Sequence, residues 1–116
     1  MIEIKKQRQG EVLVLALEGE LMGGDEAKDF QDLIFKLIQE GEVNVVVNME
    51  GVKWMNSSGL GMLMAAMTTL RSSGGDLRLA HVSDRVRRPI EVTKLDRVLR
   101  ILGSTDEAVQ SYASGE

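Results

Sequence analysis

The sequence contains no cysteine and a single histidine, His81, among its 116 residues. Without cysteine the chain cannot form a disulfide, a thiolate metal site or a thiol nucleophile, and this composition fits a reducing compartment such as the cytoplasm. No carboxylate motif accompanies His81, so a Ser-His-Asp triad is difficult to assemble, and the glycine motifs of nucleotide-binding enzymes are also missing. We therefore expect a protein that is not an enzyme and that carries no catalytic site, no metal and no cofactor.

The sequence also lacks long apolar runs and an excess of positive charge. No run approaches the ~20 apolar residues of a transmembrane helix, and the segment "MIEIKKQRQGEV" lacks the apolar core of a signal peptide. The formal net charge of -4 argues against nucleic-acid binding, which requires a basic surface. We expect one cytoplasmic domain over residues 1–116, with a frayed tail at about 113–116 and no insertion into a membrane.

Apolar patterns along the chain alternate between those of strands and those of helices. The predicted strands are Ile2–Lys6, Glu11–Leu17, Val43–Met49, Asp76–Val82 and Arg97–Leu102, with a hairpin turn at Gln9-Gly10. The predicted helices start at Asp25, at about Ser58, at Ser83-Asp84 and after Ser104. Pro89 should kink or shorten the first turns of the third helix. The order ββαβαβαβα predicts an α/β fold, with a mostly parallel, mixed sheet and helices packed on it.

The segment "WMNSSGLGMLM", Trp54 to Met64, lies where open α/β proteins usually place their functional groups. Residues 50–59 are predicted to form the loop after a buried strand, and ligands gather beyond the carboxyl ends of such strands. Ser57 and Ser58 could simply cap the following helix, which is worth about 1 kcal/mol. Alternatively, a phosphate placed there could be held by the unpaired N–H groups and the dipole of the helix.

Three segments together resemble a known family. They are "LEGEL" before the first helix, "NSSGLGMLM" at the second, and "HVSDRVRRPIEVTKLDRVLRIL" over the third helix and the last strand. In this order of elements they resemble the STAS domain, and within it the stand-alone bacterial anti-sigma factor antagonists. The resemblance covers essentially the whole chain and implies a single STAS-like domain.

The resemblance implies a switch in transcription regulation. Members of this family bind an anti-sigma factor that is also a serine kinase, and thereby free the sigma factor. That kinase phosphorylates the first serine of an Asp-Ser-Ser-Gly motif, and a serine/threonine phosphatase resets the protein. By position the acceptor here is Ser57. Asn56 and Met22 depart from the family, which usually has Asp at both positions.

The expected partner surface combines the end of the second strand with the start of the second helix. Its residues are Met22, Gly23, Gly24, Trp54, Met55, Asn56, Ser57, Ser58 and Gly59. Trp54 could instead be a packing residue, and the methionines of this region could be core residues rather than an adaptable contact surface. Two other functions stay open: a constitutive interaction module, as a scaffold or transporter accessory subunit, and a small nucleotide-binding domain.

Overall fold

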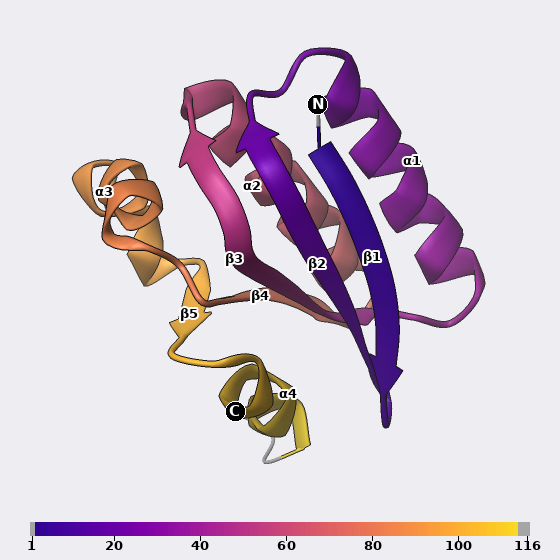
Figure 1. The fold of residues 1–116 in the computed structure, drawn as a ribbon. Coiled ribbons are helices and arrows are strands. Elements are labelled where there is room, and N and C mark those ends of the chain that lie inside the picture. The colour runs from indigo at the N-terminus through magenta and orange to yellow at the C-terminus, as the bar shows by residue number, and fades with distance from the viewer. Residues whose placement is uncertain (1, 114–116) are drawn as a thin grey trace.

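Five strands and four α-helices follow the predicted order ββαβαβαβα in the computed structural model, which describes residues 2–113 (Figure 1). The strands are β1 (Ile2–Gln9), β2 (Val12–Leu21), β3 (Asn44–Met55), β4 (Asp76–Ala80) and β5 (Arg100–Leu102). The helices are α1 (Asp25–Gln39), α2 (Ser57–Ser72), α3 (Asp84–Val92) and α4 (Thr105–Ala113), with a 3-10 turn at Leu95–Arg97. The predicted frayed tail lies outside the described residues except for Ala113, which ends α4.

The sheet has the strand order β1-β2-β3-β4-β5, with β1 antiparallel and the other neighbours parallel. The predicted hairpin is confirmed, since Gln9 lies opposite Val12 and Gly10 takes the positive φ of 64° that the tight turn requires. Because β2, β3 and β4 are parallel, their carboxyl ends meet at one edge of the sheet. The connections to α1, α2 and α3 all leave from that edge.

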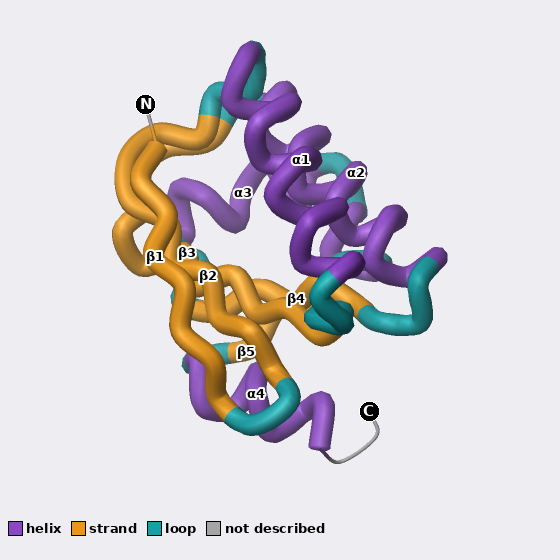
Figure 2. Tube along the Cα trace, turned by 90° about the vertical axis from the view of Figure 1, so that its right-hand side faces the viewer, coloured by secondary structure: helices purple, strands orange, loops and turns teal. Residues whose placement is uncertain are grey.

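Helices cover the two faces of the sheet unequally (Figures 1 and 2). On one face α1, α2 and α3 enclose the main core, whose fully buried side chains include Leu15, Ile34, Leu63 and Ile90. On the other face α4 packs on a smaller cluster of Val12, Val14, Val46, Ala80 and Ala108. This second cluster lies in the half of the sheet near the hairpin, and within residues 2–113 the other half of the same face has no helix over it.

Three strands are longer than predicted, and the first of them, β1, continues from Lys6 to Gln9. β2 continues through Gly19 to Leu21, and β3 continues to Met55, so the predicted loop over residues 50–59 is reduced to Asn56. The β2–β3 pairing contains two register shifts in this stretch, which interrupt the alternation that marks a strand in the sequence. Gly51 allows the close pairing, because a Cβ there would lie 2.8 Å from the carbonyl oxygen of Leu17.

Smaller differences concern the later elements. β4 ends at Ala80 rather than Val82, and the predicted strand over residues 97–102 keeps only its second half. The shortening expected from Pro89 is not seen, since α3 starts at Asp84, where Ser83 caps it, and runs past Pro89 to Val92. Val86 and Ile90 are fully buried on either side of the proline, and this burial favours the helix.

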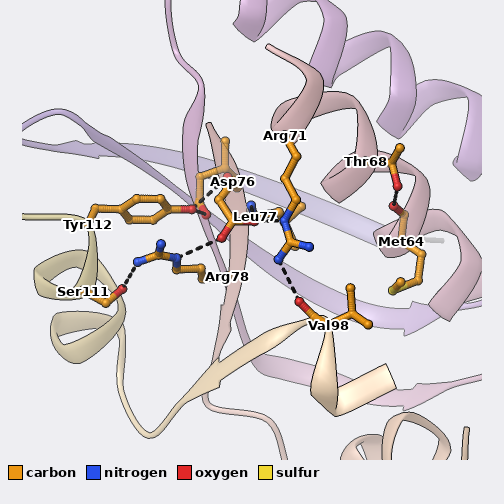
Figure 3. Close-up of polar contacts among 10 residues, drawn as sticks. Met64, Thr68, Arg71, Asp76, Leu77, Arg78, Val98, Ser111 and Tyr112 are labelled. Atoms are coloured by element: carbon orange, nitrogen blue, oxygen red, sulfur yellow. Dashed lines mark hydrogen bonds and ion pairs between the residues drawn. The ribbon is translucent and has the colours of Figure 1, made fainter. Parts of the chain in front are cut away.

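A polar network fastens α4 to the sheet (Figure 3). The Tyr112 hydroxyl lies 2.7 Å from the carbonyl oxygen of Val45 and 2.8 Å from that of Asp76. The Arg78 guanidinium lies 4.0 Å from the centre of the Tyr112 ring and donates hydrogen bonds to Ser111 Oγ and to the Asp76 carboxylate. Burial raises the pKa of Tyr112 above its ordinary value, so the hydroxyl stays a donor.

Candidate functional site

The start of α2 is fixed by Asn56, the single residue between β3 and the helix. Asn56 has an extended backbone, and its Oδ1 accepts a hydrogen bond from the backbone N–H of Gly59 at 2.8 Å. Its own carbonyl oxygen accepts from the N–H of Leu60 at 3.0 Å. Asn56 is therefore the N-cap. This corrects the alternative in which Ser57 or Ser58 caps the helix.

Ser57 and Ser58 occupy the first two positions of α2 and are both exposed. Among residues 2–113, neither their hydroxyls nor their backbone N–H groups have a hydrogen-bond partner. The first turns of α1, α3 and α4 each contain an Asp or Glu, whereas the first turn of α2 contains none. No carboxylate of its own first turn therefore opposes the positive end of the α2 dipole, which suits an added anionic group.

The loop between β2 and α1 lies directly against this helix start, as predicted. The backbone N–H of Asn56 donates to the carbonyl oxygen of Leu21 at 3.2 Å. A Cβ on Gly59 would lie 2.0 Å from that same oxygen, and a Cβ on Gly23 would lie 2.7 Å from the Cβ of Ser58. Gly23 and Gly59 are therefore required by the close approach of two backbones.

Exposed apolar side chains flank the two serines. Met22 is 38% exposed in the β2–α1 loop, and Trp54 is 40% exposed near the end of β3. Met55, by contrast, is only 3% exposed and belongs to the main core. Its side chain is therefore a packing residue, which corrects its predicted place in the contact surface. Gly24 is the N-cap residue before α1; it has a φ of 68° and provides no side-chain cap.

Sequence reasoning missed Leu21, whose backbone carbonyl joins the two segments. The signal was the glycine at position 59, the third residue of a helix, where glycine weakens the helix and no turn needs it. A glycine in such a place indicates that another backbone comes close.

The remaining candidate residues lie elsewhere. His81 accepts a hydrogen bond through Nε2 from the backbone N–H of Thr105 at 3.2 Å, which links the end of β4 to the start of α4. Arg85 and Arg88 are exposed on α3, whereas Arg87 on the same helix is half-buried. Within the described part of the chain, no group of three or more His, Asp or Glu side chains is arranged to hold a metal ion. No helix in that same range combines the length and the apolar character that crossing a bilayer demands.

Comparison with known proteins identifies the family. The STAS domain model matches residues 3–108. The chain belongs to the STAS domain family. Among curated relatives of this STAS domain, the anti-sigma-B factor antagonist of Staphylococcus aureus (strain NCTC 8325 / PS 47) is 28% identical over 78 residues, which are 67% of this chain and 72% of the relative.

Solved structures confirm the predicted fold of the domain. An anti-sigma factor antagonist from Mycobacterium paratuberculosis matches with a TM-score of 0.81 at 22% identity, over 96% of this chain and 93% of that chain. The Bacillus protein SpoIIAA in its phosphorylated form matches with a TM-score of 0.71 at 22% identity, over 95% of this chain and 99% of that chain. A sulfate transporter family protein from Wolinella succinogenes matches with a TM-score of 0.76 at 20% identity, over 91% of this chain and 87% of that chain. The fold is thus shared by antagonists and by a transporter family protein.

Proposed function

We propose that this STAS domain is an anti-sigma factor antagonist that is switched by phosphorylation of Ser57. In its unmodified form it binds an anti-sigma factor with serine kinase activity and releases the sigma factor. Phosphorylation of Ser57 ends the binding, and a serine/threonine phosphatase restores it. The observation that carries the proposal is the exposed Ser57 hydroxyl at a helix start with unpaired N–H groups and no carboxylate in the first turn.

The geometry supports a switch that acts through charge. A phosphate on Ser57 adds about -1.5 to -2 charges and three acceptor oxygens at neutral pH. The Asn56 side chain already occupies the N–H of Gly59, so the N–H groups of Ser57 and Ser58 are the donors left for the phosphate. A partner surface that fits a neutral hydroxyl would then meet an unpaired charge, which is costly at an interface.

The test is phosphate incorporation by the anti-sigma kinase encoded in the same genome. The domain is incubated with that kinase and ATP, and intact mass reports the number of phosphates. Ser57→Ala should bind the kinase but gain no phosphate, and Ser57→Asp should bind more weakly than wild type. Ser58→Ala is the matched control, because it removes the neighbouring exposed hydroxyl and should still be labelled. Labelling that persists in Ser57→Ala would place the acceptor elsewhere.

A constitutive interaction module is the second candidate. Two observations favour it: the neutral Asn56 at the cap, and the shared fold with a transporter family protein. As a scaffold or transporter accessory subunit, the domain would bind its partner regardless of Ser57. A kinase that binds without labelling the domain, together with Ser57→Asp binding as tightly as wild type, would favour this second function.

A further inference from the structure

One half of a sheet face is open to solvent. Opposite α1 and α2, the helix α4 covers only the part near the hairpin, and no helix of the described residues 2–113 lies over the ends of β2 and β3 (Figure 1). A shallow hollow of about 580 Å³ lies there. It is lined by Glu3, Glu18, Gly19, Glu20, Gly51 and Lys53. The hollow is broad and open, a shape that fits part of another protein better than a small molecule.

The charges in this hollow are arranged unfavourably for the domain alone. Glu3 lies directly opposite Glu18 across the β1–β2 pair, and Glu20 follows two residues later on the same face. Like charges directly opposite each other destabilise a sheet. Within residues 2–113 none of these carboxylates forms an ion pair, and Lys53 is the one basic residue among those lining the hollow. A cationic partner would relieve this repulsion.

Trp54 lies beside the hollow, next to Lys53 in the chain and toward the proposed phosphorylation site. It lies opposite Glu20 across the β2–β3 pair. Val52 and Met55 are both buried in the main core, and the register shift between Gly19 and Glu20 leaves the two residues between them, Lys53 and Trp54, exposed. An exposed indole beside a carboxylate favours an arginine or lysine, through cation–π attraction and ion pairing. Only Met55 and Asn56 separate Trp54 from Ser57, so the open face is continuous with the proposed partner surface.

We propose that this open face, formed by Glu3, Glu18, Glu20, Lys53 and Trp54, binds a basic segment of a partner protein. An arginine or lysine of that segment lies between the Trp54 ring and the Glu20 carboxylate, and a second cation meets Glu3 and Glu18. The proposal rests on the proposed function for the identity of the partner, which would be the anti-sigma factor. The preference for a basic segment follows from the charges and the exposed indole of the open face and does not depend on the identity of the partner.

The test uses Trp54, the only tryptophan of the chain, as its own reporter. The whole protein is titrated with a short peptide that alternates arginine and alanine, and with a matched peptide in which glutamine replaces arginine. The arginine peptide should change the Trp54 emission saturably and bind more weakly as salt is raised. The glutamine peptide should have no such effect. Equal binding of both peptides, or no saturable change with the arginine peptide, would overturn the proposal.

Two double variants with the same change in net charge locate the binding. Glu18→Gln with Glu20→Gln should weaken arginine-peptide binding about three- to thirty-fold, since two exposed ion pairs are lost. Glu11→Gln with Glu40→Gln removes two exposed carboxylates away from the hollow and should leave binding unchanged. Equal effects of the two double variants would refute the site. Urea unfolding guards against a folding defect, because the first double variant should be at least as stable as wild type.

The same variants separate this proposal from the proposed function. If Ser57 is not phosphorylated but peptide binding depends on Glu18 and Glu20, the proposed binding at the open face is supported and the proposed phosphorylation switch is refuted. If the kinase labels Ser57 and binds both double variants as tightly as wild type, the proposed phosphorylation switch is supported and the proposed binding of the partner at the open face is refuted.

Discussion

Adding one methyl group at Gly23 is expected to destabilise the domain by pressing on the start of α2. The new Cβ would lie 2.7 Å from the Cβ of Ser58 and 3.1 Å from its carbonyl carbon and oxygen. Gly23 also has a φ of 81°, which costs a residue with a side chain about 1–2 kcal/mol. Overpacking adds about 1–3 kcal/mol, so Gly23→Ala should lose about 2–5 kcal/mol in total.

A double-mutant cycle with Ser58→Gly isolates the steric contact, because the backbone strain at Gly23 is the same in both backgrounds. Removing the Ser58 Cβ should restore about 1–2 kcal/mol to the Gly23→Ala variant, while the contacts of the Ser58 carbonyl group remain. Gly24 provides the matched control. It has a φ of 68° and no atom within 4 Å of an added Cβ, so its cycle with Ser58→Gly should show almost no coupling.

Urea unfolding at constant slope gives each free energy of unfolding. A coupling energy that is equal in the two cycles would refute the contact between the β2–α1 loop and the helix start. The same conclusion would follow if Gly23→Ala and Ser58→Gly were simply additive. In either case the two segments of the proposed partner surface would not be held together by this packing.

Three further measurements test other parts of the structure. Asn56→Ala should lose about 1 kcal/mol of unfolding free energy with the N-cap, whereas Asn56→Asp keeps the cap and should not be destabilised; urea midpoints decide both. Leu63→Ala should cost about 2–5 kcal/mol because Leu63, on α2, is fully buried in the main core, and Met22→Ala, at an exposed site, is its control. Burial raises the pKa of Tyr112 above 10.0, so the unfolded chain ionises first as pH rises past that value. The free energy of unfolding should therefore fall by about 1.4 kcal/mol for each pH unit above that value. This Tyr112-dependent loss should be absent in the Tyr112→Phe variant.

The order of the elements and the hairpin could be predicted because both depend on local patterns. The β-branched run from Val43, the apolar stripe of α2 and the Gln9-Gly10 turn each identify an element without knowledge of the rest of the chain. The ends of β2 and β3 were harder to predict from the sequence. They pair with each other through a bulge at Gly51, which only the three-dimensional structure reveals.

The site was predicted as a region but not in its details. Asn56, Ser57 and Ser58 are all good capping residues, and the sequence alone does not decide which side-chain oxygen reaches the N–H of Gly59. The role of Leu21 depends on a backbone contact between segments 38 residues apart in the chain, counted from Leu21 to Gly59. The burial of Met55 accompanies the extension of β3, because residues 50–55 belong to a strand packed on the main core rather than to the predicted loop.

The described chain begins and ends at opposite ends of the sheet, and this decides how the domain is best labelled or immobilised. Ile2 lies opposite Gly19, beside the open face, whereas α4 ends near the hairpin turn (Figure 1). A fluorophore or surface anchor at Ile2 would crowd Glu3 and compete with a docking protein. An anchor placed after Ala113 would leave Ser57 turned away from the support, so carboxyl-terminal attachment is the orientation for capturing partners from solution.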